Sequence, residues 1–295
     1  MRQPRPRQGS TLVELLVALP LALLAAAAAA LLLIHVARAA RTQSAALSTS
    51  RELRHARLLL TAELEPLDGR DLVLVTDTLL EVRSHVGVLL VCDGRDPANL
   101  LVSVPAGTAD QWVSTLRIGD DVRGWQPSSA AGEAPEDRAS RLRETPTSVA
   151  HAPCLANERV AVPRWRLLLA DSTLSLLPGA PILVRRDTRL QHYRSAGAWW
   201  LGRRQRDGAL WDGLQPAAGP FASPADRGIR LRAMTSGEIP VVVLAPLADS
   251  TAERVAGIEV ALRAPRRVPG VGGARVDSAS TLVAFRATAS DRRQP

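Results

Sequence analysis

Lysine is absent from this sequence, and tyrosine, phenylalanine and cysteine together account for five of its 295 residues. All 37 basic residues are consequently arginines. Either a bias in the coding sequence or the use of arginine to contact carboxylates and phosphates explains this absence. The formal charge is +8, and three arginines before Gly9 supply three of these charges, which leaves +5 for the remainder. This charge gives no basis for predicting nucleic-acid binding.

The sequence also lacks the short motifs of common catalytic sites. It contains no G-x-S-x-G turn, no H-E-x-x-H helix and no phosphate-binding Walker loop. The histidines do not show the spacing of metal ligands. They are His35, His55, His85, His151 and His192. We therefore expect no enzyme activity, no cofactor and no metal site; the catalytic alternative is a Ser-His-Asp set that assembles only in space.

One long hydrophobic run is present, from Leu15 to Ile34, and Glu14 lies at its start. Its 20 residues form a helix of about 30 Å, the thickness of a bilayer core. A carboxylate here is costly in lipid and needs a partner. A cleaved secretory signal is one alternative, with a cleavage site at Val36-Ala37-Arg38-Ala39, although the run exceeds the usual ~7–15 residues. A buried core helix is the other, although the run has no polar face.

The segment Gly9-Ser10-Thr11-Leu12-Val13-Glu14-Leu15-Leu16-Val17-Ala18-Leu19 resembles the class III signal of type IV pilins and type II secretion pseudopilins. This resemblance implies that a prepilin peptidase cuts after Gly9 and methylates the new amino terminus at Ser10. It also implies that Glu14 pairs with the α-amine of a neighbouring subunit during filament assembly. Such an amine is mostly protonated, because its reference pKa is about 7.7–8.0.

The order of the later segments resembles the PilW-type minor pilins and the J-type pseudopilins. The matching segments are Arg185–Trp200, Val255–Arg263 and Thr281–Arg286. The implied function is a minor subunit that helps initiate or cap a type IV pilus or a type II secretion pseudopilus. Its partners would be prepilin peptidase, other minor subunits, the major subunit and the inner-membrane assembly platform. Arginines flank the apolar run on both sides, so only the resemblance places the N-terminus in the cytoplasm and the head in the periplasm.

The helix is expected to continue beyond the membrane. Apolar residues recur with helical spacing at Ala46, Leu53, Ala56, Leu60 and Leu64, and Pro66 then ends the pattern. We therefore predict an α+β fold in which a long N-terminal helix packs on a mostly antiparallel β-sheet head. The predicted parts are a leader (1–9), a transmembrane half of the helix (10–37), a periplasmic half (38–66) and a β-rich head (67–295).

Short β-like runs separated by turn residues fill the head. We predict a hairpin of Gln111–Ile118 and Asp121–Trp125, a flexible loop over 127–153 and a loop over Trp211–Asp226. The other predicted strands are Asp71–Thr76, Thr78–Arg83, Val86–Val91, Arg164–Leu169, Thr173–Leu177, Ile182–Arg186, Arg189–Ser195, Trp199–Arg203, Ile229–Ala233, Val241–Ala245, Val255–Arg263 and Thr281–Ala287.

The two cysteines, Cys92 and Cys154, either form a disulfide or are buried free thiols. A head outside the cytoplasm favours the disulfide. The adjacent segment Asp93–Asn99 carries oxygen-bearing side chains that suit calcium, but ordinary turn chemistry explains them equally.

Tryptophan is relatively abundant, with six residues. Trp199 and Trp200 point to opposite faces of a strand, so one of them is free to contact a partner subunit or a nucleobase beside Arg203, Arg204 and Arg206. Packing in the core is the simpler explanation. If one of these tryptophans is exposed beside the arginines, the functional alternative is a DNA-uptake pilus subunit with a nucleic-acid-binding head. We do not expect nucleic acid as the main partner.

Overall fold

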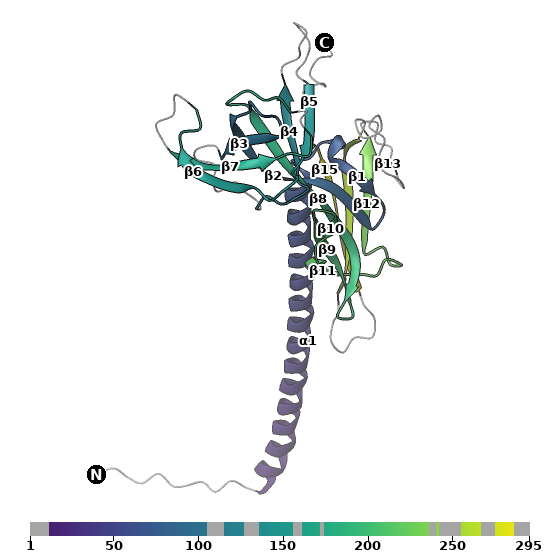
Figure 1. The fold of residues 1–295 in the computed structure, drawn as a ribbon. Coiled ribbons are helices and arrows are strands. Elements are labelled where there is room, and N and C mark those ends of the chain that lie inside the picture. Colours follow the sequence, from purple (N-terminus) through teal and green to yellow (C-terminus); the bar gives the residue numbers. More distant parts are fainter. Residues whose placement is uncertain are drawn as a thin grey trace, which may run out of the picture. The chain divides into compact units, whose positions relative to one another are not determined.

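The computed structural model describes residues 12–104, 115–126, 136–155, 161–171, 174–235, 240–241, 255–266 and 275–285 (Figure 1). The chain divides into two compact units, and their boundary within the first helix falls between Arg51 and Glu52. The fold is α+β, with one long N-terminal helix and a large, mostly antiparallel sheet.

Helix α1 runs from Leu12 to Leu64, and a short 3-10 helix, η1, follows at Gly69–Asp71. The strands are β1 (Leu72–Val75), β2 (Leu79–Asp93), β3 (Asn99–Ser103), β4 (Asp121–Gln126), β5 (Glu136–Arg141), β6 (Thr147–Ala152), β7 (Val162–Leu168), β8 (Pro181–Ser195), β9 (Ala198–Asp207), β10 (Leu210–Trp211), β11 (Gln215–Phe221), β12 (Ile229–Thr235), β13 (Pro240–Val241), β14 (Val255–Arg266) and β15 (Arg275–Ala284).

Strands β2 and β8 form the centre of an 11-stranded sheet, whose main path is β10-β9-β8-β2-β3-β7-β6. Each of the two central strands has 15 residues, and they pair antiparallel from Leu79↔Gln191 to Leu90↔Pro181. Strand β8 also pairs with β4 at one end and with β9 at the other. The described strands β13, β12, β14 and β15 form a second, four-stranded sheet in that order.

Two hydrophobic clusters lie along the β2–β8 pair. The first combines Leu53, Ala56, Leu60 and Leu64 of α1 with residues of both sheets, including Leu80 and Leu190. The second contains the far ends of the same strands, including Leu89 and Ile182. Buried polar side chains separate the two clusters on this face of the sheet; they are Ser84, Arg186 and Thr188. The two clusters are therefore joined by a polar region rather than by continuous apolar packing.

Several predicted element boundaries differ from the structure. Strand β2 joins two predicted strands, because a bulge between His85 and Gly87 shifts the alternation without ending the pairing. Strand β8 likewise joins the two predicted strands around Asp187. Helix α1 ends at Leu64, two residues before the predicted bound at residue 66.

The predicted loop over 127–153 was wrong for residues 136–141 and 147–152, which form strands. This part contains β5, which pairs with β4, and β6, which pairs with β7. Their sequences carry few large apolar side chains, so the β pattern was absent although the partner strands supply the hydrogen bonds. The predicted loop over Trp211–Asp226 similarly contains β11, which pairs with β9.

The predicted hairpin around Gly119 was also wrong in its pairing. Strand β4 pairs with β5 and β8, while residues 115–118 are not in a strand and residues 111–114 lie outside the described part. Only the turn itself is present, with Gly119 at φ +83° and the Asp120 side chain accepting from Arg117 N at 2.8 Å. The predicted strand Thr173–Leu177 is not a strand over 174–177, where Leu174 and Leu176 instead fill the second cluster.

Candidate functional site: the first half of helix α1 and its anchor

Glu14 lies in the first turn of α1, and its side chain is exposed. The helix that follows consists largely of leucine and alanine, which have high helix propensity. A negative charge is favourable here because the free N–H groups of a helix N-terminus carry partial positive charge. The predicted processing residues, Gly9 and Ser10, lie outside the described residues.

The helix after Glu14 exposes its apolar side chains on all sides. Every residue from 14 to 41 is exposed, and among the leucines the exposed fraction reaches 69% at Leu33. The exposed large apolar residues are Leu15, Leu16, Val17, Leu19, Leu21, Leu23, Leu24, Leu31, Leu32, Leu33, Ile34 and Val36. Pro20 lies inside the helix, where it removes one backbone hydrogen bond. A helix that is apolar all round requires a cover of lipid or of other helices.

Among the described residues, α1 is the one helix long and apolar enough to cross a membrane. None of its most apolar window is buried within the protein. A core helix would be mostly buried, so this exposure argues against a buried core helix. A signal sequence near the N-terminus has the same length and composition, so the helix alone does not separate an anchor from a signal.

The last turns of α1 have a different surface and are anchored to the sheet. Leu60 and Leu64 are fully buried in the first hydrophobic cluster. Beside them, Glu63 forms an ion pair with Arg203 of β9 at 2.9 Å and accepts a hydrogen bond from Ser84 of β2 at 3.2 Å. The helix end is thus fixed to two strands by both apolar and polar contacts.

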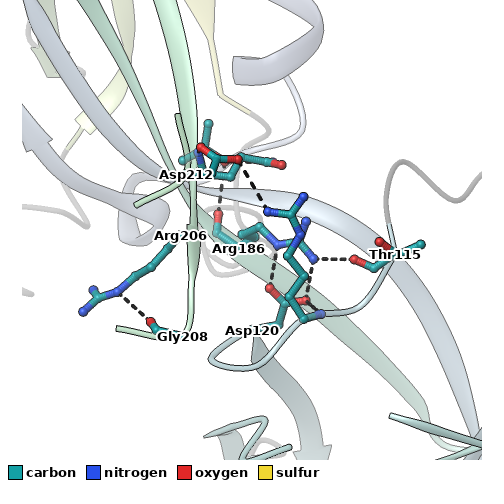
Figure 2. Close-up of polar contacts among 9 residues, drawn as sticks. Thr115, Asp120, Arg186, Arg206, Gly208 and Asp212 are labelled. Atoms are coloured by element: carbon teal, nitrogen blue, oxygen red, sulfur yellow. Dashed lines mark hydrogen bonds and ion pairs between the residues drawn. The ribbon is translucent and has the colours of Figure 1, made fainter. Parts of the chain in front are cut away.

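The polar region between the two clusters contains one partner of a buried ion pair, Arg186. Arg186 of β8 donates to Asp120 from Nε at 2.7 Å and from Nη2 at 2.8 Å, and its Nη2 also donates to the carbonyl of Thr115 at 2.5 Å (Figure 2). Both side chains are 1% exposed. This bidentate geometry satisfies two charges that would otherwise be costly to bury.

Two further ion pairs lie on the opposite face of β8. Arg185 pairs with Asp71 of η1, and Arg189 pairs with Glu81 of β2 at 2.5 Å. Burial lowers the pKa of Arg185, and the nearby Asp68 carboxylate opposes this shift. The prediction from sequence missed these pairs. One indication was available in the sequence. Successive residues of a strand point to opposite faces, so the adjacent Arg185 and Arg186 place one arginine on each face of the sheet, where each needs a carboxylate partner if it is buried.

A disulfide joins Cys92, at the end of β2, to Cys154, which follows β6. In the neighbouring turn, Arg95 donates to Asp93 from Nε at 3.0 Å and from Nη2 at 2.8 Å. These hydrogen bonds lower the pKa of Asp93. Asp96 accepts from Ala98 N at 3.0 Å. The carboxylates that suited calcium are therefore engaged in turn contacts, and the described residues contain no group of three or more metal-ligating side chains.

The predicted tryptophan and arginine group is largely engaged within the head. Trp199 and Trp200 are both half-buried, and the Trp199 ring lies 5.0 Å from the ring of His192. Trp200 Nε1 donates to Ser195 O at 3.2 Å. Two guanidiniums lie over the ring of Trp211, with Arg189 at 4.4 Å and Arg204 at 5.2 Å from the ring centroid. These contacts are typical of packing at the rim of a sheet rather than of an open stacking platform.

Comparison of the chain with protein-family models, with curated proteins and with solved structures finds no match in any of the three.

Proposed function

We propose that this chain is a non-enzymatic minor pilin or pseudopilin subunit that helps initiate or cap assembly of a type IV pilus or a type II secretion pseudopilus. The observation that carries the proposal is the first half of α1, which exposes apolar side chains on every side and holds one acid, Glu14, in its first turn. Lipid covers such a surface before assembly, and neighbouring helices cover it afterwards.

In this proposal, prepilin peptidase removes residues 1–9, and Ser10 becomes the amino terminus. The first half of α1 spans the inner membrane, with its N-terminus in the cytoplasm. The head lies on the periplasmic side, and the Cys92–Cys154 disulfide is consistent with an oxidising compartment. The last turns of α1, held by Leu60 and Glu63, connect the membrane span to the head.

Glu14 then carries the assembly contact. Its carboxylate pairs with the protonated α-amine of a neighbouring subunit, so that two charges that are costly alone in lipid neutralise each other. The pair also fixes the stagger between adjacent helices.

The first test is the position of the mature N-terminus. Co-expression with a prepilin peptidase should yield a chain that begins at Ser10, and mass spectrometry measures this directly. The variant Gly9→Glu should retain the leader. A mature chain that begins at Ala40 or later would instead identify an ordinary secreted protein and overturn the proposal.

The second test separates assembly from processing. Glu14→Gln should be cleaved like the wild type but should be depleted from filaments, because it cannot neutralise the neighbour's amine. Glu65→Gln is the matched control, since Glu65 is an exposed acid just beyond the end of α1. Immunoblots of purified filaments measure incorporation, and equal incorporation of both variants would contradict the proposed role of Glu14.

A further inference from the structure

A cleft of 370 Å³ lies on the sheet face opposite the hydrophobic clusters. It is formed by β2, β4, β5 and the turn that follows β7. The lining residues are Arg83, Asp121, Arg123, Ala139, Ser140, Arg141, Ala170 and Asp171. The strand register brings charged residues together here. Asp121 of β4 pairs with Arg185 of β8 on one side and with Arg141 of β5 on the other.

Two guanidiniums of the cleft, those of Arg83 and Arg141, are held more loosely than the buried one of Arg186, whereas Arg123 is buried and lies 3.6 Å from Asp121. Arg141 lies 3.9 Å from Asp187, and half of its side chain is exposed. Arg83 Nη1 donates to the carbonyl of Arg70 at 3.4 Å. The Arg186 contacts, by comparison, are 2.5 to 2.8 Å long. Arg83 and Arg141 can therefore reorient toward a ligand without breaking a short ion pair.

The charge balance of the cleft indicates the kind of ligand. Three arginines and two aspartates line it, and Asp187, which lies against Arg141, is also paired with Arg206 at 3.2 Å, so the group as a whole keeps an excess of one positive charge. Burial raises the pKa of Asp121, while the charges of Arg123, Arg83 and Arg141 act in the opposite direction. A single carboxylate neutralises this excess, whereas a phosphate with about −1.5 to −2 charges overcompensates it beside two aspartates.

We propose that this cleft binds a carboxylate presented by a peptide segment of another protein. Guanidinium forks bind a carboxylate in a bidentate manner. The volume lies near the lower end of the roughly 300–1,000 Å³ range of ligand sites, which suits a few residues rather than an isolated carboxylate group. Ala139 and Ala170 provide small apolar walls for the residues beside the acid. This binding requires nothing of the proposed filament assembly, so the two proposals fail separately.

The test uses the full chain in detergent micelles and isothermal titration calorimetry. The probe is a blocked pentapeptide with one glutamate among alanines, and the same peptide with glutamine is its control. Acetate and inorganic phosphate are titrated in parallel. The glutamate peptide should bind, the glutamine peptide should not, and acetate and phosphate should bind more weakly than the glutamate peptide.

Three variants assign the binding to the cleft. Arg141→Gln should weaken binding of the glutamate peptide by about tenfold, because this is the change in affinity that loss of one charge-assisted hydrogen bond typically causes. Asp121→Asn should strengthen binding, because it removes a like charge from the cleft. Arg95→Gln is the control, since Arg95 is an exposed arginine paired with Asp93 outside the cleft, and it should bind like the wild type.

Equal binding of the glutamate and glutamine peptides would overturn the proposal. So would tighter binding of phosphate or acetate than of the glutamate peptide, since either identifies a free small anion as the ligand. If Arg141→Gln melts at a lower temperature than the wild type, Asp121→Asn decides the question, and unchanged or weaker binding by that variant rejects the site.

Discussion

The first half of α1 and the head differ in which side chains they expose and which they bury. Between Glu14 and His35 the helix has no charged residue, and its leucines are exposed. In the head, many leucines are buried, and so are Arg123, Arg185 and Arg186, each paired with an aspartate. The comparison shows that the head is stabilised by contacts within the chain, whereas the apolar surface of the first half of α1 is left exposed by the described part of the chain.

The strongest test of this comparison is to remove one charge from a buried pair of the head. Asp120→Ala leaves the Arg186 guanidinium buried without its carboxylate, so the free energy of unfolding should fall by about 3–5 kcal/mol. Urea titration followed by tryptophan fluorescence measures this loss.

The double variant Asp120→Leu with Arg186→Met is the control for that experiment. It removes both charges and should recover most of the lost stability, because no unpaired charge remains. If Asp120→Ala were as stable as the wild type, the pair would not contribute to the stability of the head.

A second test compares two leucines of the same helix. Leu60 is fully buried, whereas Leu24 is 68% exposed. Leu60→Ala should lower the free energy of unfolding of the head by about 2–5 kcal/mol, because it leaves a cavity in the first cluster. Leu24→Ala should change it by less than about 0.5 kcal/mol. Equal losses in urea titrations of the two variants would remove the distinction between the halves of α1.

The smallest expected effect concerns the pH dependence of the head. Burial lowers the pKa of His85, which lies across from Arg185 on β8. The unfolded chain, with a histidine pKa near 6.5, therefore binds more protons than the folded head once the pH falls below that value. Stability should decrease as the pH falls from about 6.5 toward the lower pKa of the folded state.

His85→Gln should remove that part of the pH dependence. Melting temperatures of the wild type and the variant at pH 7.5 and 5.0 test this expectation. An identical decrease in both proteins would assign the effect to other groups.

The sequence was sufficient to predict the helix and the general class of the fold. The uncharged run from Leu15 and the stripe through Leu64 are local patterns with helical spacing, so the end of α1 was predicted to within two residues. Strands β5 and β6 were missed because their pairing depends on β4 and β7 rather than on their own apolar content.

The buried ion pairs were missed for a different reason. Arg186 and Asp120 are 66 residues apart, and nothing in the local sequence of either residue identifies the other. The cleft likewise depends on β5, which the sequence pattern had assigned to a loop. The first half of α1, by contrast, could be predicted as an exposed apolar helix, because the pattern that indicates it lies in one continuous segment of the sequence.

The absence of lysine has a consequence for how the two regions respond to alkali. Every ion pair described in the head uses a guanidinium, a group that stays protonated in proteins under moderate alkali. In the proposed mature chain, which has no lysine, the only amine is the α-amine of Ser10, and the reference pKa of an α-amine is about 7.7–8.0. In the proposed filament, alkali that deprotonates this amine would remove the ion pair at Glu14, whereas the guanidinium ion pairs within each head would stay charged.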